Sequence, residues 1–157
     1  MTTAAPTTIS RSVDVEASPD VVWQLVSDLP QMGTLSPENT GGSWLGGATG
    51  PAVGARFRGA NRHGWRRWST QVTVTECEAG RRFAFEVTSL GMGVAQWSYD
   101  VAARPGGCTV TESWRDQRGP AMGVLGRLAT GVADRTAYTV ESIERTLAAV
   151  KSRAEQS

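Results

Sequence analysis

The last third of the sequence constrains the fold most, because a long run of strand patterns changes there into one apolar helical stripe. Between residues 55 and 116, apolar and polar residues alternate in successive segments separated by short turns, which is typical of antiparallel strands. Gly119-Pro120 ends this run. From about Met122 to Arg153, apolar residues recur every three or four positions, which predicts one long amphipathic helix. Such a sheet and helix must bury their apolar faces against each other.

The N-terminal part predicts a strand and two short helices. Residues from Thr7 to Glu16 alternate as a half-buried strand does. A helix is expected to begin after the cap residue Ser18 and to end at Pro30, and a second helical turn to run as far as Pro37. Six further strands are expected at Ser43–Leu45, Ala55–Arg62, Trp68–Glu78, Arg82–Leu90, Val94–Ala103 and Cys108–Asp116.

This element order predicts an α+β fold in which a curved, seven-stranded antiparallel sheet wraps around the long C-terminal helix. The glycines at positions 41, 42, 46, 47, 54 and 59 suit a strongly bent sheet. A curved sheet and a straight helix diverge at one end, so we expect an internal cavity. At 157 residues the chain has room for one core, so we expect residues 7–153 to form a single domain and residues 1–6 a disordered tail.

Composition excludes several classes of function. The formal charge is +1, which gives little support to nucleic-acid binding. No apolar run is long enough to span a membrane, and the first residues do not resemble a signal peptide, so the cytoplasm is the expected location. Cys77 and Cys108 lack metal-type spacing, and His63 is the only histidine. We therefore expect no metal and no cofactor; whether the protein is a monomer or a homodimer stays open.

Three stretches carry a resemblance to a known superfamily: VDVEASPDVVW at residues 13–23, VGARFRGANR at 53–62 and PGGCTVTE at 105–112. They resemble the helix-grip (SRPBCC) superfamily of START domains, birch-pollen-allergen-like proteins, and polyketide cyclase/dehydrase-like and lipid-transport proteins. The second stretch, with RWST at residues 67–70, resembles small and mostly uncharacterised actinobacterial members. The resemblance implies the helix-grip fold and a ligand cavity. It leaves the reaction open, because this fold hosts carriers, cyclases, hydrolases and chaperone regulators.

The inward face of the predicted sheet supplies the candidate ligand-binding residues, with the long helix opposite it. A wall of this kind suits a hydrophobic ligand, although the same side chains could simply fill a core. The apolar candidates are Phe57, Trp68, Val72, Phe85, Trp97, Tyr99 and Trp114, opposed by Leu125, Leu128 and Val132. The same alternation along the strands predicts that four polar side chains also point inward: Arg11, Asn61, Thr70 and Glu112.

Glu112 is the main candidate for chemistry. Burial would raise the pKa of its carboxyl group and suit it to proton transfer or to anchoring a polar ligand group. The alternative is a structural ion pair with Arg11, since the first and last strands are neighbours in the helix-grip order. Tyr99 and His63 are further candidates for proton transfer, although His63 is expected in an exposed loop without a partner.

The arginines between Glu38 and Glu76 form the clearest charge feature, because no acidic residue lies in that interval. They suit an anionic headgroup, a coenzyme-A phosphate or a weak contact with an anionic membrane surface, although a solvated strand face would look the same. RNA binding is not expected, since no RNA-binding motif accompanies them. The arginines are Arg56, Arg58, Arg62, Arg66 and Arg67.

Three functions follow from these features. The first is binding or transport of a hydrophobic or amphipathic small molecule, such as a lipid or a polyketide-like compound, in the cavity. The second is a cyclase/dehydrase-type enzyme that acts on an aromatic or polyketide substrate. The sequence contains no established catalytic motif that supports this function over the first. The third is a protein-interaction module without ligand.

Glycines between residues 119 and 131 suggest a mobile portal to the cavity, or close helix packing.

Overall fold

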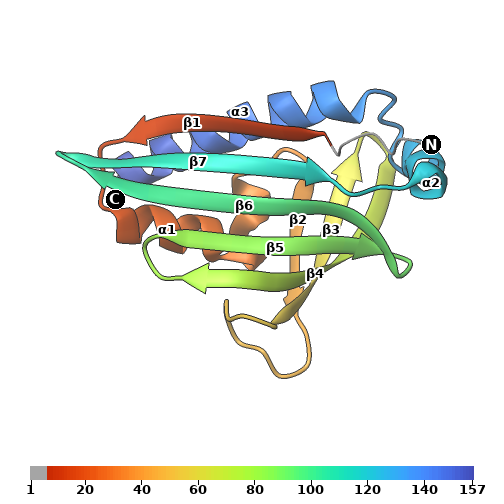
Figure 1. Ribbon diagram of the computed structural model, residues 1–157, viewed down its shortest axis with the longest axis horizontal. Coiled ribbons are helices and arrows are strands. Elements are labelled where there is room, and N and C mark those ends of the chain that lie inside the picture. The colour runs from red at the N-terminus through yellow and green to blue at the C-terminus, as the bar shows by residue number, and fades with distance from the viewer. Residues whose placement is uncertain (1–6) are drawn as a thin grey trace, which may run out of the picture.

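The alternating segments form seven strands, with three α-helices and one 3₁₀ helix (η1), in a computed structural model that describes residues 7–157 (Figure 1). The tail predicted for residues 1–6 lies outside the described residues. In chain order the elements are β1 (Thr8–Val15), α1 (Pro19–Ser27), η1 (Leu29–Thr34), β2 (Asn39–Trp44), β3 (Arg56–His63), β4 (Arg66–Glu78), β5 (Arg82–Ser89), β6 (Met92–Arg104), β7 (Gly107–Asp116), α2 (Pro120–Thr130) and α3 (Arg135–Glu155).

The strands form one antiparallel sheet in the order β1-β7-β6-β5-β4-β3-β2. The first strand therefore pairs with the last, as the resemblance to the helix-grip superfamily implied. Register shifts interrupt the β2–β3, β4–β5 and β5–β6 ladders, and such irregularities bend a sheet. Figure 1 shows β2 and β3 turned away from the direction of β5, β6 and β7, so the sheet is strongly curved. The predicted fold class is confirmed.

The concave face of the sheet is covered by α3 and α1. The helix α3 contacts β1 and β7, and it also packs on α1. Ile143 and Val150 of α3 are fully buried, as are Val22 and Val26 of α1. Each such side chain contributes about 1.5–3 kcal/mol through burial. The core between the sheet and these two helices is therefore closed to solvent at these side chains.

The prediction of one helix from Met122 to Arg153 was wrong, because the helix is broken between Thr130 and Arg135. Gly131 ends α2 in the left-handed conformation, with a φ of 72°, which glycine adopts without steric cost. Asp134 then caps α3 by accepting a hydrogen bond from the Ala137 amide at 3.0 Å. The break lets α2 leave the line of α3 and lie at one end of the sheet (Figure 1).

Candidate functional site

A cavity of about 220 Å³ lies between the concave face of the sheet and the helices. Its wall is mostly apolar, and α2, η1 and the first part of α3 contribute to it along with β3 to β7. It occupies the end of the molecule where α2 has turned away from α3. The predicted residues that the structure places in this wall are Phe57, Asn61, Trp68, Thr70, Val72, Phe85, Trp97, Tyr99, Glu112, Trp114 and Leu125.

The structure does not place Leu128 and Val132 in the cavity wall. Leu128 is 69% exposed on α2, and Val132 is buried in the connection between α2 and α3. Both errors have the same cause, since the predicted unbroken helix would have turned these residues toward the sheet. Leu125 remains at the wall but is 44% exposed, which places it near solvent at the edge of the cavity.

Sequence reasoning missed several wall residues. Leu29 and Met32 enter from η1, and Thr139 and Ser142 enter from α3, where both are buried. A small polar residue on an otherwise apolar helical stripe was the available signal for the last two. The other missed residues are Ser36, Glu38, Asn39, Val87, Ser89, Leu90, Val94, Ala95, Arg118, Met122, Gly126, Ala129, Thr130, Arg135 and Tyr138.

Glu112 and Tyr99 form a buried polar pair in this wall. They are direct cross-strand partners on β7 and β6, and each is only 2% exposed. The Tyr99 hydroxyl donates a hydrogen bond to Oε1 of Glu112 at 2.8 Å. Oε2 of Glu112 is buried and has no hydrogen-bond partner among the described residues. The pair therefore includes one unsatisfied polar atom, buried in the mostly apolar wall of the cavity.

Burial decides the protonation of this pair. Desolvation raises the pKa of Glu112 to about 8, although the hydrogen bond from Tyr99 acts in the opposite direction. Burial also raises the pKa of Tyr99 well above its usual value, and the nearby Glu112 carboxyl adds to this effect. At neutral pH Glu112 is therefore mostly a neutral carboxylic acid, which can donate a hydrogen bond as well as accept one.

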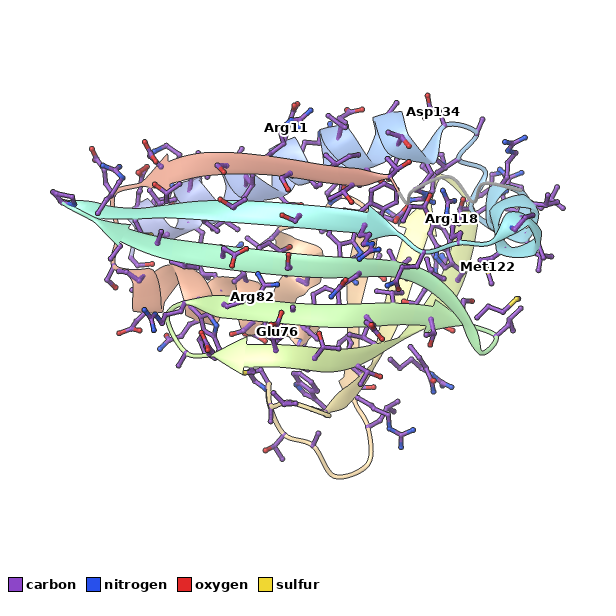
Figure 2. The ribbon with its side chains drawn as sticks, in the orientation of Figure 1. Arg11, Glu76, Arg82, Arg118, Met122 and Asp134 are labelled. Carbon is purple, nitrogen blue, oxygen red and sulfur yellow. The ribbon has the colours of Figure 1, made fainter. Side chains whose placement is uncertain are left out.

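Arg11 lies opposite Glu112 in the β1–β7 register, as expected, but the two side chains form no ion pair. Arg11 instead has its Nε 3.7 Å from Oε1 of Glu144 on α3, and its side chain is 46% exposed. Because β1 is the edge strand, its arginine reaches solvent past the sheet (Figure 2). The structural ion pair proposed as the alternative role of Glu112 is therefore absent.

His63 ends β3 and is half-buried, so the expectation of an exposed loop without a partner was wrong. Its Nδ1 lies 3.0 Å from the carbonyl oxygen of Thr130, and its ring meets Tyr138 edge-on at 5.2 Å. His63 is outside the cavity wall. These contacts join the β3–β4 hairpin to the α2–α3 connection, so of the three candidates for proton transfer only Glu112 and Tyr99 line the cavity.

The comparison with known families decides the classification. The sequence profile of the family described as polyketide cyclase / dehydrase and lipid transport matches residues 6–155. The chain belongs to this family. No match to a curated protein was found.

Solved structures similar to this polyketide cyclase/dehydrase and lipid-transport family member share its fold. A polyketide cyclase-like protein of Corynebacterium glutamicum is 27% identical, with a TM-score of 0.66 over 95% of this chain and 91% of its own. A START superfamily protein of Mycobacterium smegmatis is 15% identical, with a TM-score of 0.70 over 95% of this chain and 97% of its own. The di-domain ARO/CYC protein BexL, from the BE-7585A biosynthetic pathway, is 18% identical, with a TM-score of 0.71 over 96% of this chain and 50% of BexL.

Two further pairs of polar side chains belong to the cavity wall of this family member, one of them at the start of α3. Nη1 of Arg135 lies 2.8 and 3.1 Å from the two carboxylate oxygens of Glu38, and both side chains are at least four-fifths buried. In the other pair, Nδ2 of Asn61 on β3 donates to Oγ1 of Thr70 on β4 at 3.3 Å. Figure 2 shows Arg118 and Met122 at the α2 end of the molecule.

The five arginines of β3 and β4 divide between two faces of the sheet. Arg56 and Arg58 are exposed while Phe57 between them is buried, so these two arginines are on the outer face. Arg62 and Arg67 are paired in register and are also exposed. Arg66 pairs with His63 on the inner face, beside α2. None of the five forms an ion pair among residues 7–157.

In the same part of the chain, no helix is long and apolar enough to cross a membrane, and no three His, Cys, Asp or Glu residues are grouped as metal ligands.

We expect α2 to open more readily than α3. Both ends of α2 adjoin glycine, and it contains Gly123 and Gly126, each of which costs up to about 1 kcal/mol of helix stability relative to alanine. In hydrogen exchange, amides at residues 119–131 should exchange at least tenfold faster than those at 136–150. Equal protection of the two segments would show that α2 is a fixed part of the cavity wall.

Proposed function

We propose that this protein binds a hydrophobic or amphipathic small molecule, lipid-like or polyketide-like, in the cavity under α2. The observation that carries the proposal is the unpartnered Oε2 of Glu112 in an apolar wall. Leaving a buried polar atom without a partner costs about 1–3 kcal/mol. A ligand with a hydrogen-bond acceptor, such as a ketone or ester carbonyl, would remove this cost by accepting a hydrogen bond from the neutral carboxyl group.

The aromatic wall supports a flat or chain-like ligand. Trp97 and Trp114 lie side by side with ring centroids 6.5 Å apart, and Phe85 joins them at the wall. Aromatic faces bury large apolar area and stack with planar rings. A ligand in contact with these indoles would also change their fluorescence, which provides a direct signal of binding.

Native mass spectrometry of the protein, purified from the cells that naturally produce it, tests this proposal. We expect an adduct of one small molecule per chain, and extraction should release a compound with an apolar body and at least one carbonyl or hydroxyl group. The compound added back to emptied protein should change the tryptophan fluorescence saturably. A protein that carries no adduct and gives no fluorescence change with a panel of lipids and aromatic polyketides would contradict the proposal.

A second candidate function, proton-transfer chemistry of the cyclase/dehydrase type, is favoured by the pairing of Glu112 with Tyr99. A carboxyl group with a pKa of about 8 can both donate and recover a proton near neutral pH. The variant Glu112→Gln separates the two functions, because glutamine keeps the shape but cannot transfer a proton.

If the protein is an enzyme, Glu112→Gln should lower turnover of the extracted compound class at least a hundredfold. The variant should change the affinity for that compound by less than about tenfold, since the amide can still donate one hydrogen bond. Product formation is followed by liquid chromatography, and binding by fluorescence. Unchanged turnover in the variant would remove Glu112 from the reaction, and no turnover in the wild type would leave the carrier function.

A further inference from the structure

The outer side of α2 carries an apolar stripe that faces solvent. Ala121, Val124, Leu125 and Leu128 recur at the spacing of one helical face. All four are exposed, Val124 to 62% and Leu128 to 69%. The apolar face of a surface helix normally packs on the core, so an exposed stripe marks an interaction site.

Two turns extend this stripe. The β3–β4 turn presents Trp65, which is 81% exposed, and it is held against the end of α2 by the contact of His63 with Thr130. The β5–β6 turn presents Leu90, which is 82% exposed and shares the cavity wall with Leu125. We call Ala121, Val124, Leu125, Leu128, Trp65 and Leu90 the α2 patch. It contains most of the large exposed apolar side chains among residues 7–157 and lies at the edge of the cavity.

The charges beside the α2 patch are mainly basic. No acidic residue occurs between Glu38 and Glu76, nor between Asp116 and Asp134, and these two intervals supply every residue of the α2 patch except Leu90. Arg66 lies 4.4 Å above the Trp65 ring and also packs on Gly131 at the end of α2. The exposed Arg127 of α2 and Arg67 of β4 add further positive charge.

We propose that the α2 patch docks on the surface of an anionic lipid bilayer. An exposed apolar stripe on a helix inserts at the boundary between headgroups and acyl chains, tryptophan is favoured at that depth, and arginines attract anionic headgroups. A second copy of this chain fits the patch less well, because a symmetric interface would bring the arginines of the two copies together. Docking in this orientation turns the edge of the cavity toward the lipid.

Co-sedimentation with vesicles tests this docking and does not depend on any cavity ligand. We expect the wild-type protein to bind vesicles of equal parts phosphatidylcholine and phosphatidylglycerol, with weaker binding as salt is added. Binding to vesicles of phosphatidylcholine alone should be at least about tenfold weaker. The variant Leu128→Glu should lose at least about tenfold in affinity for the mixed vesicles.

The matched control is Val53→Glu, which places the same charge at a 68% exposed valine in the β2–β3 loop, away from α2 (Figure 1). It should bind mixed vesicles as the wild type does. Leu128 is outside the cavity wall, so its variant should also keep the wild-type melting temperature and the wild-type binding of anilinonaphthalene sulfonate in the cavity. Equal loss in both variants, no vesicle binding by the wild type, or a dimer that Leu128→Glu dissociates in the absence of vesicle binding would each overturn the proposal.

Discussion

Replacing Glu112 with glutamine is expected to remove a pH dependence of roughly 5 kcal/mol from the free energy of unfolding. Burial raises the pKa of Glu112 from an ordinary 4.5 to about 8 in the folded protein. That interval, at about 1.4 kcal/mol per pH unit, gives the size of the effect. The carboxyl group is 2% exposed and has one unpartnered oxygen, so its charged form has little to stabilise it.

The direction of the effect follows from proton binding. At pH values below 4.5, Glu112 is protonated in both states and does not disfavour the folded one. As the pH rises from there to about 8, the unfolded chain loses this proton while the folded protein keeps it, so stability falls. Above about pH 8 both states are ionised and the loss is complete. The wild type should therefore be less stable than Glu112→Gln in alkaline buffer and similar to it in acid.

Urea unfolding at a series of pH values measures this difference directly. Subtracting the Glu112→Gln curve from that of the wild type cancels other titrating groups. One of these is Asp116, whose pKa burial acts to raise but the hydrogen bonds and charge of Arg118 lower overall. The control Glu144→Gln alters a surface carboxylate that meets Arg11 at 3.7 Å and should change stability by less than about 1 kcal/mol. Parallel wild-type and Glu112→Gln curves would show that Glu112 is already ionised in the folded protein.

The strands were predictable because their signals are local and repeated. In β7, for example, Val110, Glu112 and Trp114 alternate with more exposed residues, and a Pro-Gly-Gly turn precedes the strand. The alternation of apolar and polar residues alone was enough to predict that the Glu112 side chain points inward. It could not tell that the carboxyl group would meet Tyr99 and not Arg11, because that choice depends on where the sheet edge lies and on what α3 contributes.

The break between α2 and α3 escaped sequence reasoning because the apolar period continues across it. Leu128 and Val132 keep the spacing of a helical stripe on either side of Gly131. The local signals for a break were present, since glycine favours the end of a helix and Asp134 suits the start of the next one. The break has two consequences: α2 lies at the end of the sheet, and its Val124, Leu125 and Leu128 are exposed.

A cavity is harder to predict from sequence than the residues that line it, because no residue pattern corresponds to empty volume. The sequence identified the large side chains on the sheet, which would equally have filled a core. What keeps the space open is the break at Gly131 together with the small Thr139 and Ser142 on α3. Large side chains at those two positions would have occupied the same space.

Filling the cavity should abolish ligand binding without unfolding the protein. Ala95 lies on β6 in the cavity wall and is 2% exposed, so the variant Ala95→Phe directs a ring into space that is already empty. Phenylalanine also favours strands more than alanine does. We expect the affinity for the extracted compound, or for anilinonaphthalene sulfonate, to fall at least a hundredfold, which is close to 3 kcal/mol. Stability should stay within about 1 kcal/mol of the wild type, or rise.

Ala102→Phe is the matched control, because it makes the same change on the same strand at an exposed position. It should bind the probe as the wild type does. Fluorescence titration gives the affinities, and urea unfolding of both variants reports whether the added ring is accommodated. If Ala95→Phe folds stably and still binds with wild-type affinity, the ligand does not occupy the space beside Glu112, and the unpartnered carboxyl oxygen has another role. If only Ala95→Phe loses binding, the cavity is the binding site, and its size limits the ligands that the protein accepts.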